Sequence, residues 1–155
     1  MSLVKLNNQS ISAVSALPSG IDTGKILQVV QGTYATSGIN TTSTSYVDTG
    51  LDVNITPSSS SNKILVFATF QGQTSANTVF SIFRDSTNLL GDLGFARLED
   101  ASKQRAFSLQ FLDSPSSSSQ LNYEVKYKSY GSATSSFHPQ GSDTTAMIQA
   151  IEVLA

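Results

Sequence analysis

The chain contains few residues that could carry out catalysis or hold a metal ion. Its only histidine is His138, and it has no cysteine. A histidine that acts as a general base needs an oriented nucleophile, and one that binds a metal needs partners at ligand spacing. Neither accompanies His138, and the nearby Pro139 and Gly141 predict a surface loop. We therefore expect His138 to have no catalytic or metal-binding role.

The acidic residues form two small groups, Asp48 with Asp52 and Glu99 with Asp100. Two carboxylates can cleave a glycosidic bond when they face each other at a defined separation, in a cleft that also offers aromatic rings for sugar stacking. The chain has no tryptophan, and two of its tyrosines fall on a predicted core face. Since Asp and Glu are usually exposed, we expect both groups to be solvated surface residues.

Other sequence signatures of enzymes are missing as well. The segment Gly91 to Gly94 lacks the following lysine and the strand-to-helix context of a phosphate-binding loop. The many serines never occur in a Gly-x-Ser-x-Gly elbow. The sequence therefore predicts a protein that is not an enzyme, with no catalytic residues, no metal and no cofactor.

The composition excludes two classes of partner. Charged residues make up 13% of the chain, whereas 27 residues are serine and 15 are threonine. A net charge of -2 provides no basic surface for phosphates, so we expect no nucleic-acid binding. The longest apolar run, Ile64 to Ala68, is far short of the roughly 20 residues that span a bilayer, so we expect no membrane insertion.

After Gly24 the sequence predicts about eight strands separated by turns rich in serine, glycine and proline. The clearest strand alternates Leu121, Tyr123, Val125 and Tyr127 with polar residues, a period of two that buries one face. Residues 93–104 are predicted to be a loop with one helical turn at most. Many short strands without long helices are typical of an all-β antiparallel sandwich or barrel. The predicted strands cover residues 26–30, 45–56, 63–70, 78–84, 89–95, 105–112, 121–128 and 145–154.

Two of these strands are apolar on most of both faces. A strand in a two-sheet sandwich normally turns one face to the core and the other to water, so the run from Ile64 to Phe70 needs a second cover. A neighbouring subunit is the simplest cover, and the alternative is that the loop 91–104 folds over that face within one chain. The subunit interface that we predict consists of Leu65, Phe67, Phe70, Met147, Ile151 and Val153.

Residues 1–23 are predicted to be an N-terminal arm, and residues 24–155 the sandwich. The arm has scattered apolar residues among Ser, Asn and Gln, and it breaks at Pro18 to Gly20. We interpret it as a docking segment that becomes ordered only where it binds, and the alternative is a frayed terminus without function. The residues predicted to dock are Leu3, Val4, Leu6, Ile11, Val14 and Leu17.

Several sequence segments together resemble those of fibre and capsid-decoration proteins of bacteriophages, especially cyanophages. The short arm is followed by Gly24 to Val30, and a serine run separates Ile55-Thr56-Pro57 from Lys63 to Val66. The other segments are Phe83 to Thr87, Leu112 to Pro115 before further serines, and the terminal Ile151 to Leu154. Together they span most of residues 24 to 155.

The resemblance implies a trimeric jelly-roll head like those of tumour necrosis factor and complement C1q, assembled in the host cytoplasm and displayed on a virion. The arm would attach to the major capsid protein or another virion protein. The absence of a long shaft between arm and head favours a capsid decoration, cement or head-fibre protein. The alternative is a tail-fibre or baseplate module whose loops 73–77 and 133–143 bind a host surface glycan. From the residues alone, a dimer would satisfy the same pattern as a trimer.

Overall fold

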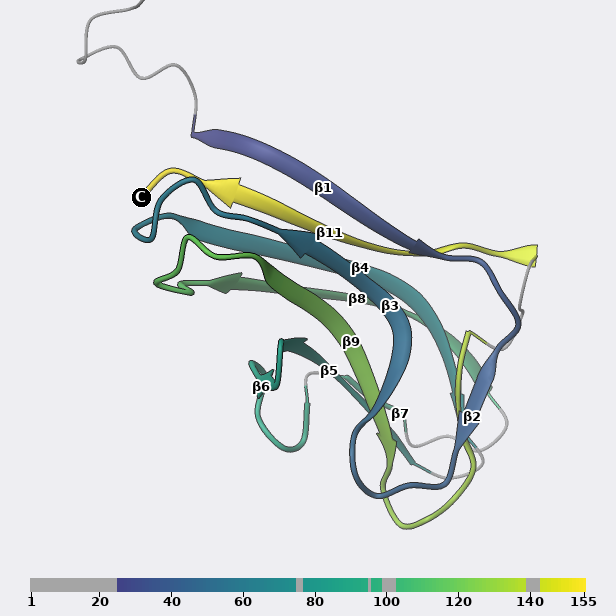
Figure 1. The fold of residues 1–155 in the computed structure, drawn as a ribbon. Helices are drawn as coiled ribbons and strands as arrows, with labels where there is room; N and C mark the ends of the chain where they lie inside the picture. The colour runs from purple at the N-terminus through teal and green to yellow at the C-terminus, as the bar shows by residue number, and fades with distance from the viewer. Residues whose placement is uncertain (1–24, 75–76, 95, 99–102, 139–142) are drawn as a thin grey trace, which may run out of the picture.

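The computed structural model describes residues 25–138 and 143–155, apart from residues 75–76, 95 and 99–102 (Figure 1). Within these ranges the chain forms eleven strands and no α-helix. The strands are β1 (Ile26–Tyr34), β2 (Ile39–Thr41), β3 (Val47–Ile55), β4 (Lys63–Thr74), β5 (Thr78–Arg84), β6 (Thr87–Asn88), β7 (Ala96–Leu98), β8 (Lys103–Asp113), β9 (Leu121–Ser129), β10 (Ser135–Phe137) and β11 (Ala146–Val153). The described part of the chain has no helix that is long and apolar enough to cross a membrane.

The strands form two antiparallel sheets packed face to face (Figure 1). In the first sheet the order is β1-β11-β4, with β8 on the other side of β4 and with β10 and β2 continuing from one end of β4. In the second sheet β3, β9 and β5 are neighbours, and β6 and β7 pair with β5. The long strands from β3 onward alternate between the sheets, as they do in a jelly roll. The predicted all-β sandwich is confirmed.

The core lies between the sheets and follows the period-two pattern of the strands. Tyr123 and Tyr127 of β9 are fully buried there, as the alternation predicted. β4 contributes its even-numbered residues, so its apolar character divides between an inward and an outward face. The inward residues of the two central strands are Leu121, Tyr123, Val125 and Tyr127 of β9 and Ile64, Val66, Ala68 and Phe70 of β4.

The predicted strand at residues 89–95 is wrong. Gly91 and Gly94 have positive φ angles of 79° and 60°, and a turn at Asp92 and Leu93 lies between them, so the extended backbone is interrupted. The strand that pairs with β5 in this region is β7, which follows this turn. The predicted four-residue hairpin loop is shorter in the structure, because Asp85 adopts φ of 51° and the chain reverses before Thr87. The short strands β2 and β10 were not predicted.

Gly32 lets the edge of the first sheet approach the second. A Cβ added at this position would overlap the backbone carbonyl oxygen of Asp52 on β3 and lie 3.2 Å from the Ile148 side chain. The obstacle is backbone, which cannot rotate away as a flexible side chain can. The absence of a side chain at Gly32 therefore brings β1 close to β3 at one side of the sandwich.

We expect Gly32→Ala to destabilise the protein by about 2 kcal/mol, a typical cost of overpacking. The neighbouring Thr33→Ala, at an exposed position, is the control and should change stability by less than about 0.5 kcal/mol. Urea unfolding at equal chain concentration measures both. Equal midpoints for the two variants would show that β1 and β3 can separate at this point without cost.

A buried carboxylate ties the two sheets together at one end. Asp113 ends β8 in the first sheet, and its Oδ2 accepts hydrogen bonds of 2.6 Å from Arg84 Nη1 and from the Tyr123 hydroxyl in the second. Burial and this carboxylate raise the pKa of the Tyr123 phenol well above its usual value. Tyr123 therefore remains a neutral hydrogen-bond donor throughout the ordinary pH range.

Removing the hydroxyl with Tyr123→Phe should cost about 1–2 kcal/mol, since a hydrogen bond to a charged group is lost while Arg84 still compensates the carboxylate. Tyr127→Phe is the matched control, because Tyr127 is equally buried but no hydrogen bond of its hydroxyl occurs among the described contacts. Thermal unfolding should separate the two variants. A larger loss in Tyr127→Phe would contradict the role assigned to Asp113.

Candidate docking face

The outward face of the first sheet carries a row of apolar side chains that crosses four strands. Val29 of β1 lies opposite Ile151 of β11, Ile151 lies opposite Leu65 of β4, and Leu65 lies opposite Leu112 of β8. Because paired residues in neighbouring strands point to the same face, these four side chains form one continuous line across the sheet. We call these four residues the apolar row.

The apolar row is open to solvent at both of its ends. Val29 is 55% exposed and Leu112 is 51% exposed, while Leu65 and Ile151 between them are half-buried. The next row along the sheet is uncharged as well, with Phe67 among three glutamines, one of which donates from Gln149 Nε2 to Gln31 Oε1. An apolar, uncharged patch of this kind is the composition found at the centre of protein interfaces.

The outer face of the second sheet differs, because the chain covers it with its own residues. Val79, Ser81 and Phe83 of β5 point away from the core and are nevertheless buried. Tyr46 and the turn after β6 lie over them: the Tyr46 ring packs edge-on against Phe83 at 5.1 Å, its hydroxyl donates to the Asp92 carbonyl at 3.0 Å, and a Cβ at Gly94 would lie 2.9 Å from the Val79 side chain. This part of the predicted 91–104 loop thus covers β5 and not the outward face of β4.

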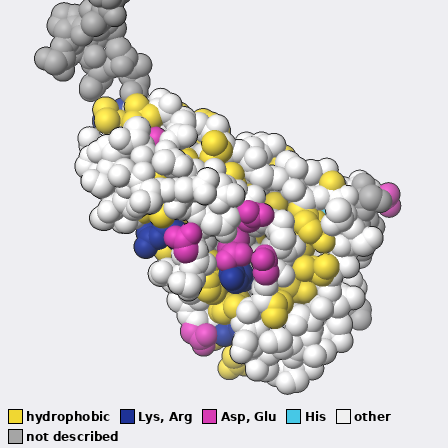
Figure 2. Space-filling view, in the orientation of Figure 1, with side chains coloured by type: hydrophobic (Ala, Val, Ile, Leu, Met, Phe, Trp, Pro, Cys, Tyr) yellow, Lys and Arg dark blue, Asp and Glu magenta, His cyan; other side chains and the backbone are white. Residues whose placement is uncertain are grey.

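Charged side chains gather over β3 and β9 of this second sheet. Figure 2 shows acidic and basic side chains next to each other on that face. Lys126 Nζ lies 2.7 Å from Glu124 Oε1. Burial raises the pKa of Glu124, the hydrogen bond from Lys126 lowers it, and Asp48 and Asp52 raise it further, with a net increase. As predicted, Asp48 and Asp52 are exposed.

The predicted interface residues divide between two faces of the first sheet. Leu65, Phe67, Met147, Ile151 and Val153 all lie on the outward face, where Met147 is 40% exposed. Their contact with a second subunit stays a prediction.

Phe70 is a correction to the predicted interface. It has the opposite parity on β4 and packs in the core against the rings of Phe80, Phe107 and Phe137. The assignment treated the whole run from Ile64 to Phe70 as one surface, although successive residues of a strand face opposite ways.

Val29 and Leu112 belong to the apolar row and were not among the predicted interface residues. Leu112 could have been found from the sequence, because it continues the outward series of Ser108 and Gln110 and is the apolar member of an otherwise polar face. The six predicted docking residues of the arm, and Glu99 with Asp100, lie outside the described residues.

The prediction of a surface loop at His138 is wrong for the side chain, which is 1% exposed. The imidazole packs edge-on to Tyr34 at a ring distance of 5.6 Å, and the backbone amide donates to the Gln71 carbonyl at 2.8 Å. Proline and glycine nearby predicted a turn but carried no information about which way the histidine points. Across the described ranges, no group of three or more His, Cys, Asp or Glu residues is placed to hold a metal ion.

One end of the first sheet is fixed by the buried carboxylate of Glu152 in β11. Its Oε1 accepts hydrogen bonds from the Ser58 amide at 2.7 Å, the Ser58 hydroxyl at 2.7 Å and Asn62 Nδ2 at 2.6 Å. Its Oε2 accepts a hydrogen bond of 2.6 Å from Gln28 Nε2. Burial alone would raise the pKa of Glu152, but these hydrogen bonds outweigh it and lower the pKa to about 2. The carboxylate thereby joins β1, β11 and the connection from β3 to β4.

Comparison with known proteins does not assign the chain to a family. Neither a protein-family model nor a curated protein matches the chain. Among solved structures, a chain from infectious bursal disease virus, Gx strain, aligns with 12% sequence identity and a TM-score of 0.33, over 86% of this chain and 37% of the viral chain. A TM-score this low carries no argument. The class that the fold defines is an all-β jelly-roll sandwich with one sheet face covered by the chain itself and one open apolar face.

Proposed function

We propose that this chain is a structural protein of a bacteriophage particle and not an enzyme. In this proposal it is a capsid decoration, cement or head-fibre protein, located on the virion, and residues 24–155 form a homotrimeric head. The N-terminal arm attaches the head to the major capsid protein or to another virion protein. The sequence resemblance supports the phage particle and the trimer, and the open apolar row supports self-association.

The observation that carries the self-association is the contrast between the two outer sheet faces. The chain covers the outward residues of β5 with Tyr46 and its own turn at Gly91 to Gly94, but leaves Val29 and Leu112 about half exposed. When another molecule covers a continuous line of open apolar surface, the assembly is stabilised by about 25 cal/mol per Å² of apolar area buried.

A second copy of the chain fits this face by charge. Of the outward residues in the middle of β11 and β4, none carries a charge, and Lys63 lies at one end of β4. Copies of this face can therefore be brought together without placing like charges opposite each other, which would cost several kcal/mol. The competing occupant is the arm, whose apolar residues could lie on the same row.

Light scattering on the full-length protein and on a truncated chain beginning at Gly24 tests the proposal. We expect the mass of three chains for both, because the face that associates lies within the sandwich. A full-length monomer together with an associating truncated chain would mean that the arm covers the row. Two monomers, or a stable dimer, would overturn the homotrimer.

A further inference from the structure

The strand β8 forms an open edge of the first sheet. Among the described residues it pairs with β4 on one side and with no strand on the other. Its pairing with β4 is unbroken from Lys103 to Asp113, and the strand of 11 residues contains no proline or glycine. The stretch from Ala106 to Leu112 is also uncharged. A long, regular and uncharged edge is the kind to which other strands add.

The other long strands at the sheet edges are protected. β1 has a register shift between Ile26 and Gln28, and its Gly32 lies against the Asp52 carbonyl of β3. β3 has a register shift after Asp48 and carries acidic side chains. β6 and β7 pair with the outer side of β5. Register shifts, charges and covering strands are means by which proteins prevent strand addition, and β8 lacks all three between residues 106 and 112.

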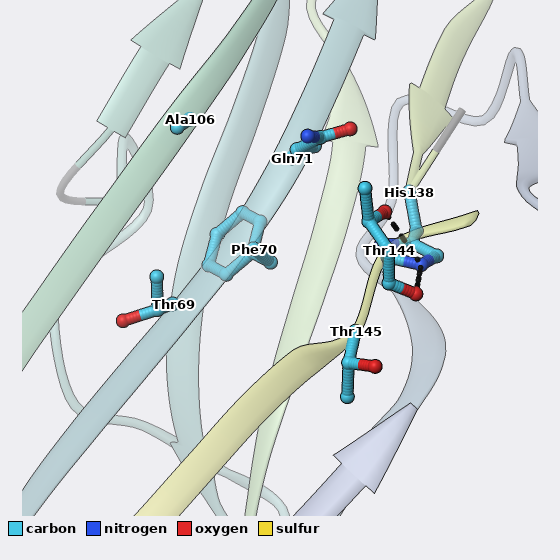
Figure 3. A pocket seen from close by; sticks show the side chains of 7 residues that line it. All are labelled: Thr69, Phe70, Gln71, Ala106, His138, Thr144 and Thr145. Carbon is cyan, nitrogen blue, oxygen red and sulfur yellow. Dashed lines mark hydrogen bonds between the residues drawn. The ribbon is translucent and has the colours of Figure 1, made fainter. Parts of the chain in front are cut away.

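The main-chain groups of every second residue of β8 point to this open edge. Figure 3 shows Gln71 of β4 between Ala106 of β8 and His138, and the His138 amide donates to the Gln71 carbonyl at 2.8 Å. Successive residues of a strand hydrogen-bond to opposite sides, so the even-numbered residues of β4 bond to β8. Their partners in β8 are the odd-numbered residues. The main-chain groups that point away from β4 are therefore those of Ala106, Ser108, Gln110 and Leu112.

The core is open to solvent along the same strand. Phe107 and Phe111 point inward and pack against the buried core, but both are only half-buried, whereas Leu109 between them is 1% exposed. The Phe107 ring lies 5.0 Å from that of Phe80. A strand added beside β8 would therefore cover aromatic rings as well as pair main-chain groups.

A second copy of β8 matches this edge when it runs antiparallel about a two-fold axis at Leu109. Ser108 of one copy then lies opposite Gln110 of the other, and their outward amides and carbonyls exchange hydrogen bonds. Phe107 of one copy lies opposite Phe111 of the other, in the non-hydrogen-bonded position where cross-strand side chains come closest. The symmetry repeats each pairing, so the half-buried rings of both copies are covered.

The charges of β8 favour the antiparallel orientation. Arg105 lies near one end of the strand and Asp113 at the other, with no charged residue between them. In the antiparallel register Arg105 of one copy is level with Asp113 of the other. Parallel strands would instead place two copies of the same charge together.

We propose that β8 pairs through its open edge with β8 of a second copy, in antiparallel orientation, and so joins the first sheets of two copies into one continuous sheet. The contact goes beyond the proposed homotrimer, which associates through outward side chains of the sheet and not through its edge. Leu112 contributes its side chain to the apolar row and its main chain to the edge. On a particle the β8 contact would link one copy, or one homotrimer, to the next.

Sedimentation equilibrium of the full-length protein at increasing chain concentration tests the contact. The mass at micromolar concentration gives the base assembly, and we expect a further rise above about 0.1 mM, because hydrogen bonds gain little net free energy and association costs freedom of motion. Ser108→Pro removes an amide hydrogen that points to the open edge and leaves the ladder with β4 intact, as proline does on edge strands. It should weaken this further association about thirtyfold, since each copy loses one hydrogen bond.

Ser108→Ala is the matched control, because it keeps the amide and should give the wild-type mass at every concentration. Should Ser108→Pro fail to fold, Ser108→Lys places a charge on the edge and should prevent the same association. A wild-type mass that stays constant up to about 1 mM would overturn the proposal, and so would a rise that the folded proline or lysine variant retains. A monomeric base assembly overturns the homotrimer but not the β8 contact, so the two proposals fail separately.

Discussion

Leu112→Asp is expected to convert the proposed homotrimer to monomers at micromolar chain concentration. Leu112 ends the apolar row and is 51% exposed, so the folded chain tolerates a charge there. In the proposed assembly the substitution would bring a carboxylate from each copy into an apolar interface, where desolvation and like-charge repulsion cost several kcal/mol. A loss of about 4 kcal/mol weakens association roughly a thousandfold. Sedimentation velocity measures the change.

Leu93→Asp is the matched control for this variant. Leu93 is also an exposed leucine, 57% accessible, but it lies in the turn beside the second sheet. It should keep the wild-type mass and circular dichroism spectrum. A trimeric Leu112→Asp would refute the apolar row as the interface, and loss of the trimer in both variants would mean that added negative charge alone dissociates the assembly.

Glu152→Gln is expected to lower the unfolding free energy by about 3 kcal/mol at neutral pH. The pKa of about 2, against an ordinary value of 4.5, means that the folded protein stabilises the ionised carboxylate by about that amount. The glutamine amide would also direct hydrogen toward groups that donate, namely Asn62 and Ser58. The melting temperature should fall by roughly 10 °C, compared at equal chain concentration.

The lowered pKa of Glu152 also predicts how the stability changes with pH. Because the folded pKa is depressed, the stabilisation by Glu152 is complete above about pH 4.5 and is lost as the pH falls from about 4.5 toward about 2. Denaturant midpoints measured across this window should fall more steeply in the wild type than in Glu152→Gln. Identical slopes would show that the hydrogen bonds to Glu152 do not stabilise its ionised form.

Glu124→Gln is the control with the opposite expectation. Its pKa is raised, first by burial, so the folded protein favours the protonated form and the ionised carboxylate detracts from stability. The substitution should therefore leave stability at neutral pH unchanged or slightly increased. A loss as large as that of Glu152→Gln would mean that the ion pair with Lys126 outweighs burial.

Period-two alternation made most of the strands predictable. In β3 and β9 every second residue is apolar and faces the core. The alternation along the strand therefore predicts which side chains are buried, for example Leu51 in β3 and Tyr123 in β9. Serine and proline turns such as that at Pro57 marked where strands end. The strand expected at 89–95 failed because glycines with positive φ were hidden in an apolar segment whose role is to cover β5.

The candidate surfaces could not be predicted in the same way, because they depend on the pairing of strands far apart in the chain. Val29, Leu65, Leu112 and Ile151 form a line only through the register of three strand pairs. β8 keeps an open edge because, among the described strands, β4 is its one partner in the first sheet. The sequence by itself determined the all-β class, the low charge and most strand positions, since these depend on neighbours in the chain. Only the tertiary structure decided which apolar face and which strand edge stay open, because both depend on how distant strands pair and pack.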